Sequence, residues 1–314
     1  MKSLSIIIVN WNGSEVILNC LRSIYDNLED LDFEVIIVDN NSTDGSPELV
    51  EKQFPKVSLV RLENNYGFAK ANNAGIEKCD GKYICLLNSD TEIINDSFKE
   101  IIDYMDNNDN IGILGPKLLY KDGSFQSSAG RFPGIKTELS GYFFLNRIPL
   151  LNKLFKDRFI HDEFKNIRDV DWICGACLFI RRSVIEKIGV FDELFFMYME
   201  DVDYCLRVIR NNWKIVYFPL SKVVHLGGHS VNKADYKILL NNTSSFFKYY
   251  KKHFNNFSYI LLSLIFISGT VFRIFLLSMF FMFSFRKTFK QKVVANIKVL
   301  KASFDIILNK NNII

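Results

Sequence analysis

The sequence lacks the cysteine pattern of a disulfide-rich or zinc-binding protein. Its six cysteines are scattered and most lie in apolar surroundings, which is typical of reduced, buried thiols in a cytosolic protein. Cys174 and Cys177 form a CxxC, which leaves a redox pair as an alternative, but no second ligand pair follows at zinc-site spacing. The apolar run at residues 4–9 is too short for a signal peptide, so we expect the body of the protein to stay in the cytoplasm.

A glycine-rich dinucleotide motif is also missing. The first apolar run is followed by VNWNG at 9–13, with no Gly-x-Gly-x-x-Gly, which excludes an oxidoreductase of that type. Hydrophobic residues make up 48% of the 314 positions and charged residues 24%, which excludes a disordered or collagen-like chain. This length is typical of about two domains, or of one large domain with an appendage.

Acidic residues are almost absent from residues 248–314. This stretch holds eleven lysine or arginine residues and a single acid, Asp305, and twelve of the 29 phenylalanines lie between Phe246 and Phe289. A basic, aromatic and apolar composition favours a membrane surface as partner and not nucleic acid. We therefore predict that residues 246–314 form a membrane-associated helical tail.

Strand and helix patterns alternate through the first 115 residues. The predicted strands are 4–9, 33–38, 57–62, 83–87 and 111–115, and the predicted helices are 14–28, 47–54, 68–79 and 96–107. This alternation predicts an α/β fold with a mostly parallel, Rossmann-like sheet and helices on both faces. Ligands of such sheets bind at the carboxyl ends of the strands.

The rest of the body is less regular before order returns. Residues 117–168 contain the aromatic cluster Gly141-Tyr142-Phe143-Phe144, which we interpret as part of a variable, acceptor-facing region. A strand at 172–181, helices at 183–188 and 200–211 and a strand at 215–218 follow. We expect a domain over 1–245, with a nucleotide-binding half at 1–115 and an acceptor and catalytic half at 116–245.

Polar residues follow several apolar runs directly. They stand at 10–12, 39–46 and 88–90, and an acidic group opens the helix at 200. Each alone fits a turn or a helix cap, because Asp, Asn, Ser and Gly favour both. Acids at two strand ends, together with a later acidic pair and a histidine, indicate a site for a metal-bound diphosphate.

Seven segments together resemble the GT-A-fold family 2 glycosyltransferases, especially their rhamnosyltransferase-like branch. They are SIIIVNWNG at 5–13, VDNNSTDGS at 38–46, NNYGFAKANNAGI at 64–76, LLNSDTEI at 86–93, DWICGACLFIRR at 171–182, IGVFDELFFMYMEDVDYCLR at 188–207 and VVHLGGHS at 223–230. The resemblance covers about residues 4–230. Seven segments in the family's order make it very specific.

The resemblance implies the residues that bind the donor. Asp39 matches the acid that hydrogen-bonds the nucleotide base, and Asn10, Trp11 and Asn12 match the loop beside it. Asn72 stands where many relatives carry an arginine that contacts the diphosphate. The wall near the donor sugar and acceptor is matched by Trp172, Gly175 and Ala176.

The resemblance also implies a metal site and a base. Asn88, Ser89 and Asp90 match the DxD-type motif, with Asp90 as the main ligand of Mg²⁺ or Mn²⁺ and His225 completing the shell. Asp201 matches the catalytic base. One base without a carboxylate nucleophile implies direct displacement with inversion. Asp203 points away from Asp201 on a helix and fits a salt bridge or cap.

The predicted function is transfer of a sugar from a nucleotide-diphosphate sugar to a lipid-linked saccharide in bacterial surface polysaccharide synthesis. dTDP-rhamnose is the first expectation for the donor, and a UDP-hexose is the alternative. A non-catalytic nucleotide-sugar-binding protein is a further alternative, but it is expected to have lost Asp90 or Asp201.

The apolar stretch of the tail sets how it meets the membrane. Residues 259–272 and 274–285 are apolar, and Arg273 separates them. A single crossing would place the basic residues after 285 outside, against the positive-inside rule. We predict that both flanks stay on the cytoplasmic face, with the stretch in the interface or re-entering through a bend at Ser268–Gly269 or Arg273. A single span and a packed core or oligomer helix pair are the alternatives.

Overall fold

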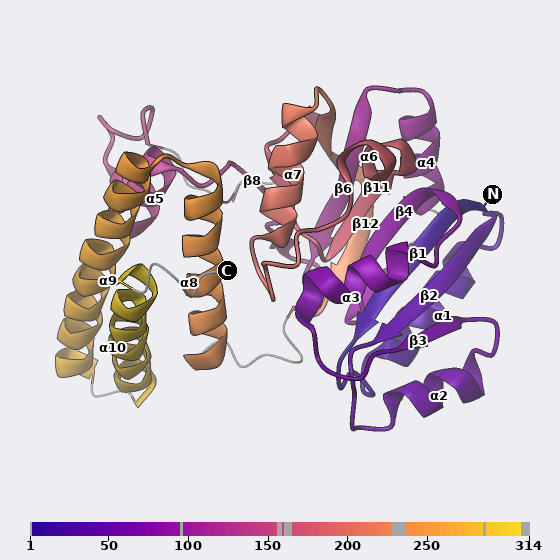
Figure 1. Ribbon diagram of the computed structural model, residues 1–314, viewed down its shortest axis with the longest axis horizontal. Helices are drawn as coiled ribbons and strands as arrows, with labels where there is room; N and C mark the ends of the chain where they lie inside the picture. The colour runs from indigo at the N-terminus through magenta and orange to yellow at the C-terminus, as the bar shows by residue number, and fades with distance from the viewer. Residues whose placement is uncertain are drawn as a thin grey trace. The chain divides into compact units, whose positions relative to one another are not determined.

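The computed structural model describes residues 2–94, 97–155, 159, 165–227, 236–284 and 287–308, which fall into two compact units (Figure 1). The sheet unit comprises Met1–Gly130, Phe159–Phe196 and Glu200–Ser230. The helical unit comprises Arg131–Arg158, Met197–Met199 and Val231–Ile314. Most of the irregular middle of the chain thus belongs with the tail.

A ten-stranded mixed sheet runs through the sheet unit in the order β3-β2-β1-β4-β11-β6-β12-β5, with β7 on β6 and β9 on β12. Its strands are β1 (Lys2–Asn10), β2 (Phe33–Asp39), β3 (Ser58–Arg61), β4 (Gly81–Asn88), β5 (Thr91–Ile93), β6 (Ile111–Leu119), β7 (Phe125–Gln126), β9 (Arg168–Asp169), β11 (Cys177–Arg181) and β12 (Lys214–His225). Strand β1 is parallel to both β2 and β4. The strand order reverses at β1, and such a switch point is where open α/β sheets bind ligands.

Helices cover both faces of this sheet. They are α1 (Ile17–Asn27), α2 (Ser46–Gln53), α3 (Gly67–Ile76), α4 (Ser97–Asp106), α6 (Arg182–Ile188) and α7 (Glu200–Arg210). Ile6 of β1 shares a buried cluster with Ile17 and Leu21 of α1. The next side chain, Ile7, points to the other face, where a Cβ on Gly75 of α3 would lie 2.5 Å from its Cγ2. Burial from both sides explains why residues 4–9 of β1 are apolar apart from Ser5, and the predicted fold class is confirmed.

The single strand predicted over 172–181 is wrong. The chain forms β10 (Trp172–Ile173), which pairs with β8 (Ala129–Gly130), and then β11, which runs antiparallel to β4 and β6. A turn at 174–176 separates the two strands. Each of the two ladders continues one residue into this turn, because Cys174 N–H donates to Ser128 O at 2.8 Å in the register of β10 with β8 and Ala176 O accepts from Asn88 N–H at 2.9 Å in the register of β11 with β4.

The helical unit contains α5 (Ile135–Phe143), the 3₁₀ turn η1 (Leu145–Arg147), α8 (Tyr236–His253), α9 (Asn256–Ser284) and α10 (Lys287–Leu308). Helix α9 packs against both α5 and α10. The aromatic cluster of the middle region lies on α9, with Tyr142 and Phe266 ring centroids 5.7 Å apart and Phe143 and Phe272 also 5.7 Å apart. These aromatic residues therefore help to hold α5 against the tail.

The predicted bend in the apolar stretch is also wrong, because α9 is one continuous helix through Ser268, Gly269 and Arg273. A Cβ on Gly269 would lie 2.4 Å from the Tyr142 ring, so this glycine lets α5 approach closely. Arg273 donates from Nη2 to Gly141 O at 3.1 Å, and its guanidinium lies 4.4 Å from the Tyr142 ring centroid. A cation at the last turn of α5 is favourable because the carbonyls there lack helical partners.

Three residues before α7, Met197–Met199, cluster with the helical unit. Ser245 of α8 donates from Oγ to Met197 O at 2.8 Å. Tyr198 and Met199 both have positive φ, 69° and 70°. This is a costly conformation for residues with a Cβ, and two in succession are held in it immediately before Glu200.

Replacing Gly269 with leucine should destabilise the helical unit. The side chain would overlap Tyr142, and overpacking of this kind costs about 1–3 kcal/mol. Ser268→Leu is the matched control, since it adds the same side chain to an exposed position on the same helix. Thermal unfolding of the full chain in detergent measures both variants. Equal melting temperatures would contradict the close contact of α5 with α9.

Candidate active site

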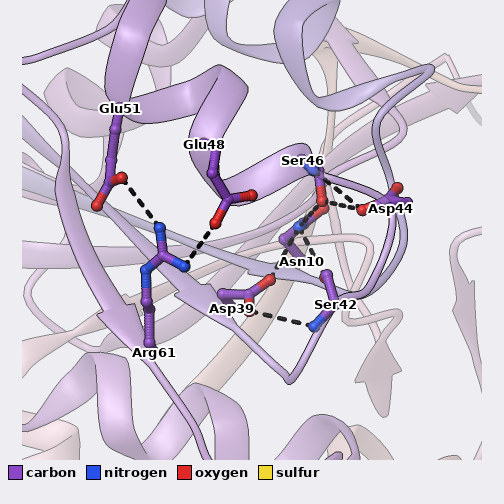
Figure 2. Close-up of polar contacts among 8 residues, drawn as sticks. All are labelled: Asn10, Asp39, Ser42, Asp44, Ser46, Glu48, Glu51 and Arg61. Atoms are coloured by element: carbon purple, nitrogen blue, oxygen red, sulfur yellow. Dashed lines mark hydrogen bonds and ion pairs between the residues drawn. The ribbon is translucent and has the colours of Figure 1, made fainter.

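Asn10 and Asp39 end the neighbouring strands β1 and β2 and are paired in register. Asn10 Nδ2 donates to Asp39 Oδ1 at 3.2 Å and to Ser46 Oγ at 2.8 Å, while Asp39 Oδ2 accepts from Ser42 N–H at 3.2 Å (Figure 2). Both side chains are buried. Asp39 is therefore held in one orientation at the carboxyl edge of the sheet, where the sequence analysis placed the nucleotide base.

The loops after β1 and β2 are bound to each other. Asn12 N–H donates to Ser42 Oγ at 2.9 Å, and Asn12 Oδ1 accepts from Thr43 N–H at 2.8 Å. Asp44 Oδ2 accepts from Ser14 N–H at 2.8 Å. Trp11, between Asn10 and Asn12 in the sequence, has 42% of its surface exposed, so its ring is accessible on the first of these loops.

Arg61 is the register partner of Asp39 on β3, but its guanidinium forms ion pairs with other carboxylates. Its guanidinium pairs with Glu48 at 2.8 Å and with Glu51 at 2.9 Å on the exposed side of α2 (Figure 2). The hydrogen bonds that orient Asp39 thus come from Asn10 and Ser42. Ser42, Asp44 and Ser46 were not predicted as individual site residues, because such residues are common in turns and helix caps and the sequence does not show their hydrogen bonds to the first loop.

Asn88, Asp90 and His225 come together at the end of β4 and β12. His225 Nε2 lies 3.3 Å from Asp90 Oδ1 and 3.2 Å from Asn88 Nδ2. Backbone pairing fixes this approach, since His225 is opposite Thr91 and Leu226 N–H donates to Asp90 O at 2.9 Å. Ser89 faces the first loop, where a Cβ on Gly13 would lie 3.5 Å from its Oγ and 2.5 Å from Asn10 Oδ1.

The donor set at Asp90 and His225 fits a divalent cation. A carboxylate oxygen and the Nε2 nitrogen of the imidazole face each other at 3.3 Å, and both are acceptors when the neutral imidazole carries its proton on Nδ1. A cation bound by both atoms would replace the repulsion between two acceptors with two favourable metal–ligand bonds. The described residues contain no group of three or more His, Cys, Asp or Glu side chains placed to hold a metal, so other ligands would have to come from substrate and water.

Asp201 lies in the first turn of α7 and faces the turn at 174–176. Its Oδ2 accepts from Gly175 N–H at 3.1 Å, and its Oδ1 accepts from Val202 N–H at 2.8 Å. The same turn bonds the metal motif, because Ala176 O accepts from Asn88 N–H. Gly175 is packed between Asp201 and Phe68, whose ring would lie 3.0 Å from an added Cβ.

Trp172 and Asn72 are both buried. The Trp172 ring lies edge-on to Phe159 with centroids 5.3 Å apart. Asn72 donates from Nδ2 to Phe68 O at 2.9 Å within its own helix. Asp203 is fully buried and pairs with Arg207 at 3.0 Å, which is the salt bridge considered for it from the sequence.

The cysteines of the CxxC are free thiols, as are the other four. Burial, and after it the charge of the nearby Asp201 carboxylate, raise the pKa of Cys174 to about 12. A thiol with such a pKa stays protonated and is a poor nucleophile. This supports the expectation of buried, reduced thiols flanking a structural turn.

Glu200, next to the expected base, is a buried carboxyl group, and its Oε2 has no hydrogen-bond partner among the residues that the structure describes. Burial raises the pKa of Glu200 well above its usual value, and the Asp201 charge raises it further. Two adjacent acids thus have different environments, since Asp201 accepts two backbone hydrogen bonds while Glu200 is desolvated.

The sequence matches the family model for glycosyl transferase family 2 over residues 5–189. The chain belongs to this family and is a glycosyltransferase. The match runs from within β1 through α6 and includes the loops after β1 and β2, Asn88–Asp90 and the turn at 174–176.

Among its relatives is the N-acetylglucosaminyl-diphospho-decaprenol L-rhamnosyltransferase of Mycobacterium tuberculosis, 31% identical over 63% of this chain and 68% of the relative. Rhamnosyltransferase WbbL of Escherichia coli K12 is 26% identical over 71% of this chain and 83% of the relative. These relatives confirm the rhamnosyltransferase-like resemblance. Among solved structures, the mannosyltransferase PcManGT from Pyrobaculum calidifontis in complex with GDP-Man and Mn²⁺ shares the fold, with a TM-score of 0.57 and 13% identity over 99% of this chain and 88% of that one.

Glu200→Gln should stabilise the protein more at neutral than at acidic pH. Because the folded pKa of Glu200 is raised, the wild type is most favoured below the unfolded value of 4.5 and loses stability as pH rises toward the folded pKa. Each pH unit in that window costs about 1.4 kcal/mol. Urea unfolding at pH 4.5 and at about pH 7.5 measures the difference between variant and wild type. A difference that does not change with pH would contradict the raised pKa.

Proposed function

We propose that this protein is an inverting, metal-dependent glycosyltransferase that moves a sugar from a nucleotide-diphosphate donor to a lipid-linked saccharide acceptor. The observation that carries the proposal is the turn at 174–176. Gly175 N–H binds Asp201 and Ala176 O binds the backbone of Asn88, so the expected base and the metal motif are attached to one short segment. Transfer requires both at the same edge of the sheet.

Asp201 is the proposed general base. An acceptor hydroxyl must lose a proton as its oxygen attacks the anomeric carbon, and a single oriented carboxylate can take that proton. The two backbone hydrogen bonds hold the Asp201 carboxylate in place. The sugar bond to the diphosphate breaks in the same step, so the configuration at the anomeric carbon inverts.

Asp90 and His225 are the proposed protein ligands of Mg²⁺ or Mn²⁺. The cation would offset the negative charge of the nucleoside diphosphate leaving group. Asn88 and Ser89 complete the motif beside it. Asp39 is proposed to bind the nucleotide base, with Asn10, Trp11 and Asn12 around it and with Asn72, Trp172, Gly175 and Ala176 lining the donor and acceptor positions.

The relatives support a donor and an acceptor class. Two of them are called rhamnosyltransferases, and one name gives the acceptor as N-acetylglucosaminyl-diphospho-decaprenol. We propose dTDP-rhamnose as donor and a lipid diphosphate-linked saccharide of a bacterial surface polysaccharide as acceptor. A UDP-hexose donor remains the alternative. A non-catalytic binding protein is disfavoured because Asp90 and Asp201 are both present and oriented.

The helical unit supports attachment to a membrane. Helix α9 contains one stretch, Asn256–Met282, that is long and apolar enough to cross a bilayer, with a mean hydropathy of 2.4. Only 33% of its most apolar 18-residue segment is buried within the protein. Eight of the exposed side chains of α9 repeat every three or four residues along one face, at positions 257, 260, 264, 268, 271, 275, 279 and 282, and all eight are apolar except Ser268. Asn256, Arg273 and Phe280 are the other exposed side chains of the described part of α9.

We propose that α9 lies in the interface at the cytoplasmic face with this stripe toward the lipid. Helix α10 packs along α9 and exposes Lys290, Lys292, Lys298 and Lys301. If α9 crossed the bilayer, α10 beside it would carry lysines through the hydrocarbon, at about 3 kcal/mol for each charge near the centre. An in-plane helix pair leaves those lysines among anionic headgroups.

Asp201→Asn should abolish sugar transfer while leaving donor affinity nearly intact. The amide keeps the shape of the side chain but cannot accept the proton, so kcat should fall by ~10²-fold or more. Transfer is measured with dTDP-rhamnose and UDP-hexoses, and donor binding by calorimetry with Mn²⁺. Asp169→Asn on the exposed β9 is the matched control and should leave both unchanged. More than about a tenth of wild-type transfer in the Asp201 variant would rule out the base assignment.

Charge on the apolar stripe should release the protein from membranes. Leu264→Asp combined with Phe275→Asp removes two exposed apolar contacts, and each is worth about 1.5–3 kcal/mol when fully buried in lipid. Flotation with vesicles of anionic lipid measures the bound fraction. Asn255→Asp adds the same charge just before α9 and should stay bound. A cysteine reporter after Lys292 that labels from the far side of the membrane would instead show a single span.

A further inference from the structure

We propose that Gln126 is a positioning residue that orients His225 for the cation. Its carboxamide oxygen holds the proton of His225 on Nδ1, which leaves Nε2 unprotonated beside Asp90. This inference rests on the metal site of the proposed function. It concerns a residue that neither the motif pattern nor the family resemblance singled out.

Gln126 reaches His225 through the sheet. It lies on β7, opposite Leu118 of β6, and β6 in turn runs beside β12, which ends at His225. Gln126 Oε1 is 2.7 Å from His225 Nδ1, a short distance for a hydrogen bond from a ring nitrogen. The Gln126 side chain is only 9% exposed, so this contact has little competition from water.

The second ring nitrogen faces the metal motif. Asn88 Nδ2 lies 3.2 Å from Nε2, and Asp90 Oδ1 lies 3.3 Å from it. With the proton on Nδ1, Nε2 is an acceptor, so the Asn88 amide can donate to it and Asp90 presents a second acceptor beside it. This is the arrangement in which a cation gains two protein ligands. With the proton on Nε2, the imidazole would donate to Asp90 and could not bind a metal.

The chain after His225 holds the Gln126 amide in place. Gly227 has a φ of 70°, and a Cβ there would lie 3.0 Å from Gln126 Nε2. The loop therefore turns closely over the carboxamide, while the β6 ladder fixes its backbone from the other side. Rotation of the imidazole would break the bond to Gln126. Partners of this kind set ligand orientation and basicity, and losing them typically costs 10–100-fold in metal affinity, which is about the loss expected here.

The variants that test the proposal are Gln126→Leu, which removes the acceptor, and Gln126→Glu, which keeps it. Mn²⁺ affinity is measured by electron paramagnetic resonance with dTDP or UDP present. We expect a loss of about 10-fold or more in Gln126→Leu and near wild-type affinity in Gln126→Glu. Gln53→Leu, the same change on the exposed end of α2, is the control and should bind as the wild type does. Equal losses in the leucine and glutamate variants would show a merely structural role and overturn the proposal.

The proton position is read separately in metal-free protein. Long-range nitrogen-15 NMR of the imidazoles, with His225 assigned by comparison with His225→Gln, should show Nδ1 protonated in the wild type and in Gln126→Glu. A proton on Nε2 in the wild type, or the same tautomer in Gln126→Leu, would overturn the proposal even if Mn²⁺ binds. If His225→Gln leaves Mn²⁺ affinity unchanged, the metal site of the proposed function fails, and the NMR result still decides whether Gln126 orients His225.

Discussion

The site depends on one irregular turn, Cys174–Ala176, that leaves the sheet between β10 and β11. Its three backbone contacts go to three different parts of the chain: Ser128 O, the Asp201 carboxylate and Asn88 N–H. Two of these contacts extend strand ladders, since Cys174 pairs with Ser128 in the register of β10 with β8 and Ala176 pairs with Asn88 in the register of β11 with β4. Because the chain changes from one sheet to the other at Gly175, its peptide N–H is available to the Asp201 side chain, and the first turn of α7 is fixed with respect to the end of β4.

Much of the sheet unit could be predicted because its local and long-range constraints agree. Strands β1, β2 and β4 are buried on both faces, so they are apolar runs, and the polar residues that end them mark the ligand edge. Asn10, Asp39, Asn88 and Asp90 were therefore identified from sequence, and the structure brings Asn10 to Asp39 and Asn88 to Asp90 through His225.

The remainder depends on contacts that no local pattern encodes. The bond between Gln126 and His225 joins residues 99 positions apart, and β7 is too short to produce a periodic signal. The run at 172–181 has the composition of one strand, and only the partners of its backbone groups show that it is two. In the tail, Gly269 and Arg273 suggested a break in the helix. In the structure they instead contact α5, which lies more than a hundred residues earlier in the sequence: Gly269 leaves room for Tyr142, and Arg273 donates to Gly141 O.

The segment Met197–Met199 groups with the helical unit and directly precedes α7, the helix that contains Asp201. These residues cluster with α8 through Ser245, while Phe196 and Glu200 on either side belong to the sheet unit. Tyr198 and Met199 already occupy a backbone region that costs of order 1–3 kcal/mol per residue, and relaxing them would change the direction in which α7 begins. The backbone cost is thus concentrated in residues immediately ahead of α7, and Met199 stands only two positions before Asp201.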